Sequence, residues 1–262
     1  MRVSTLRVVC GRGTRRASCR TDRCVSCRVL LLAATLSLLV ACVPQPAERA
    51  ASPATGPDGF PEQAYVRDAA AGQRVFRVDP ASSIIVVEVR RAGSLARLGH
   101  DHVVASHDVR GYVEPDAGRA DLYVALDRLV VDEPELRKQA GFDTEPTAEA
   151  IAGTRRNMLE KTLETDRYPY ASMAVHRAAG ATAADVSFTL HGTTRPMRVP
   201  LAVMESPEAI AVNGELALRQ TDFGITPLSV VGGAIQVEDE VKLHFDIRAR
   251  PMHASGTRGM SR

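Results

Sequence analysis

The sequence of 262 residues contains no tryptophan, and its five cysteines all lie within the first 42 residues. The rest of the chain therefore forms no disulfide and offers no thiolate as a nucleophile or metal ligand. Cys24 and Cys27 have the spacing of a metal or redox pair. No second pair follows them, however, and they lie in an arginine-rich stretch ahead of an apolar run, so we expect no site there.

Clusters of basic residues are also missing from most of the chain. Residues 1–41 contain eight arginines and a single acidic residue, Asp22. The whole chain has a net charge of +2, but the remainder has 25 basic and 30 acidic residues and is therefore mildly acidic. A mildly acidic protein has little means of neutralising phosphates. We therefore expect no nucleic acid partner.

Motifs of the common catalytic sites are absent as well. The sequence has no Gly-x-Ser-x-Gly elbow and no glycine-rich phosphate loop that opens a helix. Asp222 and Asp239 are too isolated in sequence to predict a carboxylate pair. These absences favour a binding protein over an enzyme.

The apolar run Val29–Val40 has 12 residues, too few to span a bilayer as a helix and typical of the core of a signal peptide. We predict a signal peptide over residues 1–41, with a long amino-terminal part that a translation start after Met1 would explain. Its end, Leu39-Val40-Ala41-Cys42, resembles the bacterial lipoprotein signal, in which the cysteine is diacylated on sulfur. We expect Cys42 to anchor the exported protein to a membrane, facing the periplasm; an ordinary secretory signal would instead give a soluble periplasmic or secreted protein.

Residues 42–73 are rich in alanine and proline and show neither helical nor strand periodicity. Such a composition is typical of an extended linker. We predict a flexible tether here, a folded domain over residues 74–250 and a disordered tail over residues 251–262.

Apolar and polar side chains alternate through most of the predicted domain, which indicates strands with one apolar face. The alternating segments are residues 85–90, 103–113, 121–127, 171–176, 185–190, 197–203, 215–219 and 241–248. Turn residues such as Gly192 and Asn213-Gly214 separate them. Short helices are expected from Pro134 to before Gly141 and over residues 147–163. The pattern predicts an all-β fold with one or two short helices, arranged as a closed barrel or a sandwich.

One histidine cluster has the residue types of a metal site. His100, His102 and His107 could serve a metal-dependent enzyme, but in an extended segment His100 and His102 share one face and His107 lies on the other. The three converge only if the chain bends between Gly99 and Val103. A loop that leads into a strand is the simpler interpretation, and we predict no metal.

Two segments, LHGTTRP at residues 190–196 and RQTDFGI at residues 219–225, carry a family resemblance. Together with FRVDP at residues 76–80, LGHDH at residues 98–102 and Tyr168-Pro169, they are similar in order and spacing to the YceI-like family of bacterial periplasmic lipid-binding proteins. The resemblance implies a lipocalin-like antiparallel β-barrel of about eight strands, whose apolar lumen holds a polyisoprenoid or an isoprenoid quinone. It implies no catalytic residue and no cofactor other than the bound lipid.

The apolar strand faces supply the residues that we expect to contact such a lipid. His107 falls on the apolar face of the predicted segment 103–113, where it would hydrogen-bond a quinone carbonyl or a backbone group, and Phe223 would flank the mouth. The expected lipid-binding residues are Val87, Val89, His107, Leu122, Val124, Leu126, Phe188, Leu216, Leu218, Phe223, Leu243, Phe245 and Ile247. A filled barrel that serves as an envelope interaction protein is the alternative, because periodicity does not report the size of a lumen.

Overall fold

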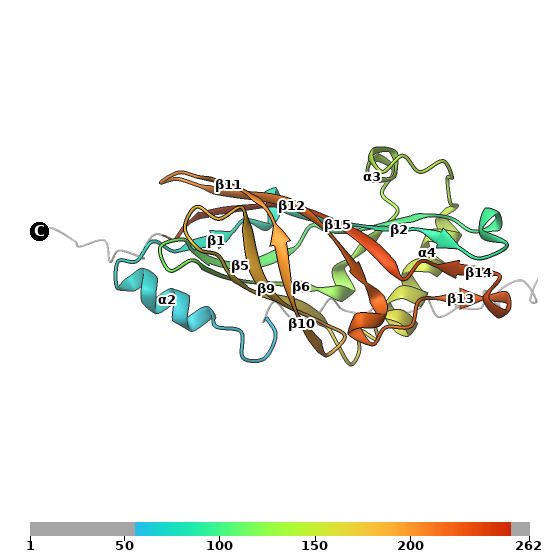
Figure 1. Cartoon of the computed structure of the whole chain (residues 1–262), viewed down its shortest axis with the longest axis horizontal. Helices are drawn as coiled ribbons and strands as arrows, with labels where there is room; N and C mark the ends of the chain where they lie inside the picture. Colours follow the sequence, from blue (N-terminus) through green and yellow to red (C-terminus); the bar gives the residue numbers. More distant parts are fainter. Residues whose placement is uncertain (1–55, 253–262) are drawn as a thin grey trace, which may run out of the picture. The chain divides into compact units, whose positions relative to one another are not determined.

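Twelve antiparallel strands form the main sheet of the computed structural model, which describes residues 56–252 (Figure 1). The strands are β1 (Phe76–Val78), β2 (Ile84–Val89), β4 (His102–Ser106), β5 (Val109–Glu114), β6 (Arg119–Ala125), β7 (Val130–Val131), β8 (Tyr170–His176), β9 (Ala183–Leu190), β10 (Thr193–Pro200), β11 (Ala202–Glu205), β12 (Ile210–Arg219) and β15 (Glu240–Pro251). The apolar faces of their alternating sequences turn toward a common interior, where Val109, Val124 and Ile247 belong to one buried cluster.

Four of these strands continue the strand before them, so eight strands go round the sheet. β2 continues β1, β5 continues β4, β7 continues β6 and β11 continues β10. The neighbours in order are β12, β15, β1/β2, β4/β5, β6/β7, β8, β9 and β10/β11. The circle closes where Ala202 of β11 pairs with Asn213 of β12. Asn213 and Gly214 therefore lie within a strand, and the turn predicted there is wrong. The prediction of an all-β, lipocalin-like fold is confirmed.

Beyond this closure, β10 and β12 are not paired within the described residues, because β10 bonds only to β9. The Leu201 amide donates to the Thr182 carbonyl (3.0 Å), so alternate amides of β10 point to β9 and those between them point toward β12. Pro196 and Pro200 occupy two of the positions whose amides would point toward β12. Since proline has no N–H to donate, the ladder to β12 cannot continue, and a seam remains between the two strands.

A second sheet of three strands is formed by β3 (Arg91–Ala92), β13 (Ser229–Val230) and β14 (Ile235–Val237). β13 and β14 are joined through Gly232 and Gly233, whose φ angles of 61° and 91° lie in the left-handed region. Glycine enters that region without the steric cost of a Cβ, so the two glycines allow the tight connection between β13 and β14.

Both helices expected in the middle of the chain are present, as α3 (Pro134–Gln139) and α4 (Ala148–Asn157). Pro134 occupies the first turn of α3, and the Thr147 hydroxyl accepts from the Ala150 amide at the start of α4 (3.2 Å). A π-helical turn, Met158–Thr162, extends α4 nearly to the end of the predicted segment.

The prediction of a tether over residues 42–73 is wrong for its last part, where helix α2 (Glu62–Ala70) lies against the strands (Figure 1). Its Tyr65 is fully buried in a cluster with Ala69, Val75 and Tyr112. The helix has only two apolar residues larger than alanine, Tyr65 and Val66, and no side-chain cap, so its stability comes from this tertiary packing rather than from a pattern visible in the sequence.

The predicted signal peptide, Cys42, the first part of the tether and the tail from residue 253 lie outside the described residues. Among residues 56–252, no helix is long and apolar enough to cross a bilayer.

Candidate binding cavity

Two cavities lie in the interior of the barrel. The Arg177 cavity, named for the arginine at its end, has a volume of about 170 Å³, and the His100 cavity has a volume of about 350 Å³. Five residues line both of them, which places the cavities in one lumen: Ile85, Met173, Phe188, Leu218 and Leu243.

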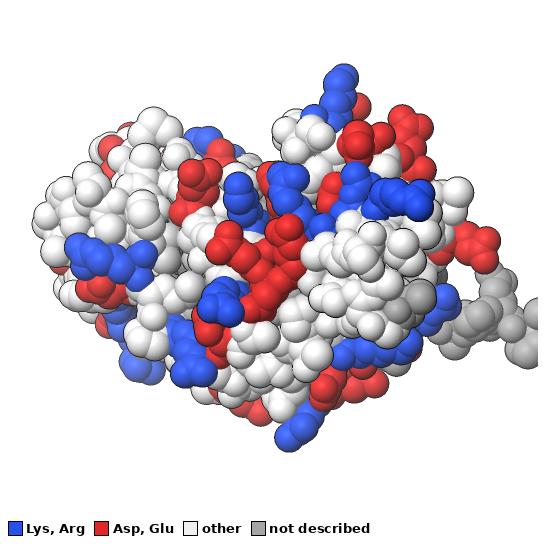
Figure 2. Space-filling model, turned by 45° about the vertical axis from the view of Figure 1, so that its right-hand side comes forward, with Lys and Arg blue, Asp and Glu red and all other residues white. Residues whose placement is uncertain are grey.

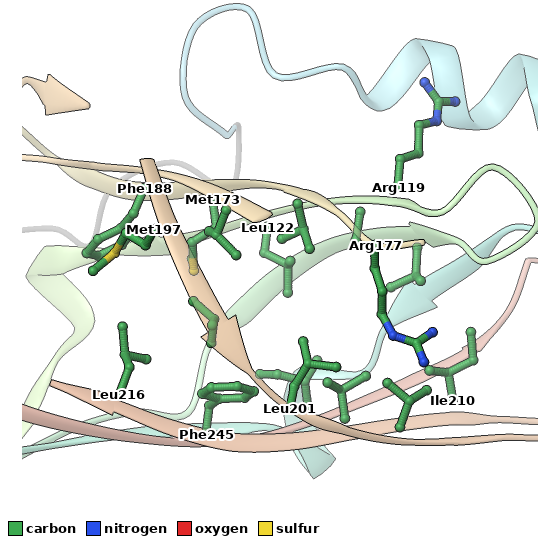
Figure 3. Close-up of a pocket in the computed structure, with 18 of the residues that line it drawn as sticks. Arg119, Leu122, Met173, Arg177, Phe188, Met197, Leu201, Ile210, Leu216 and Phe245 are labelled. Carbon is green, nitrogen blue, oxygen red and sulfur yellow. The ribbon is translucent and has the colours of Figure 1, made fainter. Parts of the chain in front are cut away.

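The lining is built from the inward positions of the strands. In the Arg177 cavity, Leu122 and Met173 project from one side of the lumen toward Leu216 and Phe245 on the other (Figure 3). Because side chains alternate across a strand, each of these strands sends every second residue into the lumen. The result is a long, largely aliphatic surface with little capacity for hydrogen bonding.

Eleven of the thirteen expected residues line one cavity or both. They are Val87, Val89, Leu122, Val124, Leu126, Phe188, Leu216, Leu218, Leu243, Phe245 and Ile247. The sequence alternation alone placed these side chains, because a strand with one apolar face has only one face to bury.

Phe223 is buried but does not line either cavity. It is 1% exposed and packs edge-to-face against Phe188, with the ring centroids 5.3 Å apart. It therefore supports a residue of the lining from behind, and the expectation that it flanks the mouth is wrong.

His107 was expected on the apolar face, and this prediction is wrong. Its side chain is 49% exposed, and its Nε2 lies 2.8 Å from Glu133 Oε2. The cause is a break in the alternation: Val104 and Ser106 of β4 line the His100 cavity, whereas on β5 the interior residues are Val109 and Val113. One extra residue between the strands reverses the faces, as a β-bulge does, and turns His107 outward.

His100 and His102 do share one face, as the sequence predicts, and both line the His100 cavity. Their ring centroids are 6.3 Å apart. Among the described residues, no group of three or more His, Cys, Asp or Glu side chains is placed to hold a metal ion. The three-histidine metal site has no support in this geometry.

A buried ionic network holds His102. Its Nδ1 lies 2.6 Å from Asp132 Oδ2, while Asp132 Oδ1 accepts from Arg137 (2.6 Å) and from the Val103 amide (3.0 Å). Burial opposes ionisation of Asp132, but the hydrogen bonds from these groups outweigh it and lower the pKa of Asp132 below its ordinary value. The carboxylate is therefore ionised and accepts from His102, whose Nδ1 carries the proton.

His100 has no such partner. Its Nδ1 is buried and makes no hydrogen bond within the described residues. Buried polar atoms are nearly always paired in native proteins, so this nitrogen marks a place where a polar group is expected.

Sequence reasoning missed several residues of the lining, among them Met173, Met197 and Arg177. The two methionines lie on the apolar faces of alternating segments, so the signal was present. Arg177 carried no such signal. Its Nε donates to the Ala181 carbonyl (2.8 Å), and its guanidinium points across the end of the cavity, whereas Arg119 points away toward α2 (Figure 3).

The two motifs that carry the family resemblance meet in space. His191 and Gly192 form the two-residue turn between β9 and β10 with positive φ angles of 50° and 71°, as in a type I′ hairpin. Arg195 Nε donates to the Asp222 carbonyl (2.7 Å), which ties this hairpin to the turn that contains Phe223. Both motifs are thus structural.

Comparison with known proteins gives a family match and several similar structures. The YceI-like domain family matches residues 76–249. A polyisoprenoid binding domain from Saccharophagus degradans, implicated in plant cell wall breakdown, is 16% identical over 68% of this chain and 98% of that chain, with a TM-score of 0.49. BcnA of Burkholderia cenocepacia is 16% identical over 65% and 98%, with a TM-score of 0.43. A Campylobacter jejuni YCEI protein is 12% identical over 55% and 81%, with a TM-score of 0.36. No curated protein matches the sequence.

Proposed function

The chain belongs to the family of YceI-like domains, and from this premise we propose that it binds an isoprenoid-type lipid, a polyisoprenoid or an isoprenoid quinone, in the lumen of its barrel. The protein then sequesters or carries that lipid, and it catalyses no reaction. We include in the proposal its export to the periplasm and its attachment to a membrane through Cys42.

The observation that carries the proposal is the apolar lumen formed by the two cavities, which share Ile85, Met173 and Leu243. Each buried methylene contributes about 0.8 kcal/mol. Association costs roughly 4–15 kcal/mol, so a few isoprene units offset it without a strong polar contact. An elongated aliphatic chain is the ligand class that such a surface favours, and the space that the side chains leave in the interior argues against the filled-barrel alternative.

The proposed function can be tested by a substitution that fills the junction of the two cavities. Met173 lines both, so Met173→Trp should block the lumen, whereas Met204, which is 59% exposed on β11, offers the same substitution outside it. Because the chain has no other tryptophan, the single indole of each variant also reports its environment by fluorescence. Lipid extracted from protein purified from the cell envelope is then quantified by mass spectrometry.

We expect isoprenoid lipid in extracts of the wild type and of Met204→Trp, and about tenfold less with Met173→Trp, since overpacking costs about 1–3 kcal/mol. The indole of Met173→Trp should show the blue-shifted emission of a buried ring, which confirms that the variant is folded. Wild-type extracts without any isoprenoid lipid would refute the proposed function.

A further inference from the structure

We propose that His100 and His102 form the polar end of the lumen and bind the uncharged, oxygen-bearing head of the isoprenoid lipid. This inference rests on the proposed function and deepens it, because it assigns one end of the lumen to a head that carries a hydroxyl or carbonyl oxygen.

The backbone places both rings at this end. His102 opens β4, and the inward residues of that strand, Val104 and Ser106, continue the line of the two histidines along the lumen. Alternation keeps His100 and His102 on the same face, and both line the His100 cavity.

The two rings offer complementary groups. His100 Nδ1 is buried without a partner, and a bound hydroxyl or carbonyl would satisfy it. His102 uses Nδ1 to donate to Asp132 (2.6 Å), so its other nitrogen is an acceptor in the neutral ring. Asp132 is itself fixed by Arg137 (2.6 Å), which holds the His102 ring in one orientation.

The charges nearby favour an uncharged head over a phosphate. Arg91 is the one Lys or Arg of the described residues that line this cavity, and it bonds to the Gly99 carbonyl (3.0 Å) and to Asp143 (3.1 Å). Arg137 is likewise committed, to Asp132 and Thr144. The ionised Asp132 behind His102 adds a repulsion for any anion, so a phosphate would be buried without a free counter-charge.

The opposite end has a different character. The charged side chains that line the Arg177 cavity are Arg119, Arg177 and Glu205. Arg119 pairs with Glu114 (2.7 Å), and Glu205 pairs with Arg74 (2.6 Å). Arg177 is the group that could compete with His100 for the head, and it therefore enters the test.

The experiment is a competition between two probes that differ only at the head. Full-length protein, stripped of lipid in mild detergent, is offered equal amounts of geranylgeraniol and of the hydrocarbon with the same carbon chain but no hydroxyl. Native mass spectrometry gives the ratio of the two complexes. Because the ratio compares ligands on the same molecules, it does not depend on the fraction of protein that is folded.

We expect His100→Leu to lower the ratio of alcohol to hydrocarbon by about three- to tenfold, which is the contribution of one neutral hydrogen bond. His100→Asn places an amide near the position of Nδ1 and should restore part of the ratio. His107→Leu, a matched change at a 49% exposed histidine, should leave it as in the wild type. Arg177→Met probes the opposite end of the lumen, and we expect it to change the ratio less than His100→Leu does.

The outcomes separate this inference from the function on which it rests. If the wild type takes up neither probe, the proposed function fails. If it takes up both and His100→Leu leaves the ratio unchanged, the assignment of the head to this end is wrong. A drop with Arg177→Met instead would place the head at the opposite end and would equally overturn it.

Discussion

Asp132 connects the lumen to the framework of the barrel. Its side chain is fully buried, and it accepts from His102, Arg137 and the Val103 amide. Its own φ angle of 59° lies in the left-handed region, which aspartate tolerates better than most residues. Asp132 accepts these hydrogen bonds as a carboxylate, and because they stabilise its charged form they lower its pKa.

We predict that Asp132→Asn lowers the free energy of unfolding by about 3 kcal/mol or more at pH 7, because it leaves Arg137 buried without its counter-charge. The folded-state pKa of Asp132 is lowered, so the stabilisation is present above about pH 4, the unfolded value, and is lost as the pH falls through the folded value. Urea unfolding at pH 7 and at pH 3 should therefore show a smaller difference between variant and wild type at the lower pH.

Asp143→Asn is the control for this experiment, since Asp143 also pairs with an arginine, Arg91, but is 74% exposed. Exposed ion pairs contribute about 1 kcal/mol or less. Equal losses for the two variants at pH 7 would show that the buried network is not the source of the stabilisation.

Helix α2 packs against the barrel and so extends the folded domain to the amino-terminal side of residue 74, its predicted start. The Tyr65 hydroxyl donates to Asp121 of β6 (2.7 Å), and the Tyr112 hydroxyl of β5 donates to Glu62 of α2 (2.6 Å). The two tyrosine rings stack at 5.2 Å. Burial and the hydrogen bond to Glu62 raise the pKa of Tyr112 to about 12, so the contact persists at moderately alkaline pH.

We predict that Tyr65→Phe loosens α2, because it removes a hydrogen bond to a carboxylate, worth about 1.5–3 kcal/mol. Hydrogen exchange of the α2 amides should accelerate while the amides of β2 and β15 stay protected. Val66→Ala, at a neighbouring position that is 39% exposed, should change exchange little. Acceleration throughout the barrel with Tyr65→Phe would contradict a local role for this contact.

The surface of the folded domain carries charged side chains, in contrast to its apolar lumen. Acidic and basic side chains are interspersed over the face that Figure 2 displays, and no broad basic patch appears on this face of the described residues. Such mixed charges give this face no concentrated positive potential of the kind that attracts anionic lipid headgroups. The membrane attachment that we propose comes instead from the lipid at Cys42.

We predict that Cys42→Ser shifts the protein from the membrane fraction to the soluble fraction of the cell envelope. A single acyl chain binds membranes only marginally, whereas the diacylated cysteine of a lipoprotein provides a stable anchor. Cys27→Ser, a matched change within the predicted signal peptide, should leave the fractionation as in the wild type. Mature protein of unmodified mass in the wild type would contradict lipidation.

Local sequence patterns were enough to predict most of the long strands, most of their inward faces and the family. Period-two alternation identifies which side of each strand is buried, so Val87, Leu122 and Phe245 were assigned to the interior correctly. The turn motifs also belong to the sequence, because His191-Gly192 and Gly224 adopt positive φ angles that few residue types accept.

The remaining features depend on contacts between segments that are far apart in the sequence. A single extra residue between β4 and β5 turned His107 out, which periodicity within one strand cannot report. The burial of Tyr65 depends on strands far away in the chain. The lumen holds cavities rather than packed side chains because its width follows from the tilt and stagger of eight strands. The burial of His100 Nδ1 without a partner likewise depends on residues that only the folded sheet brings around it.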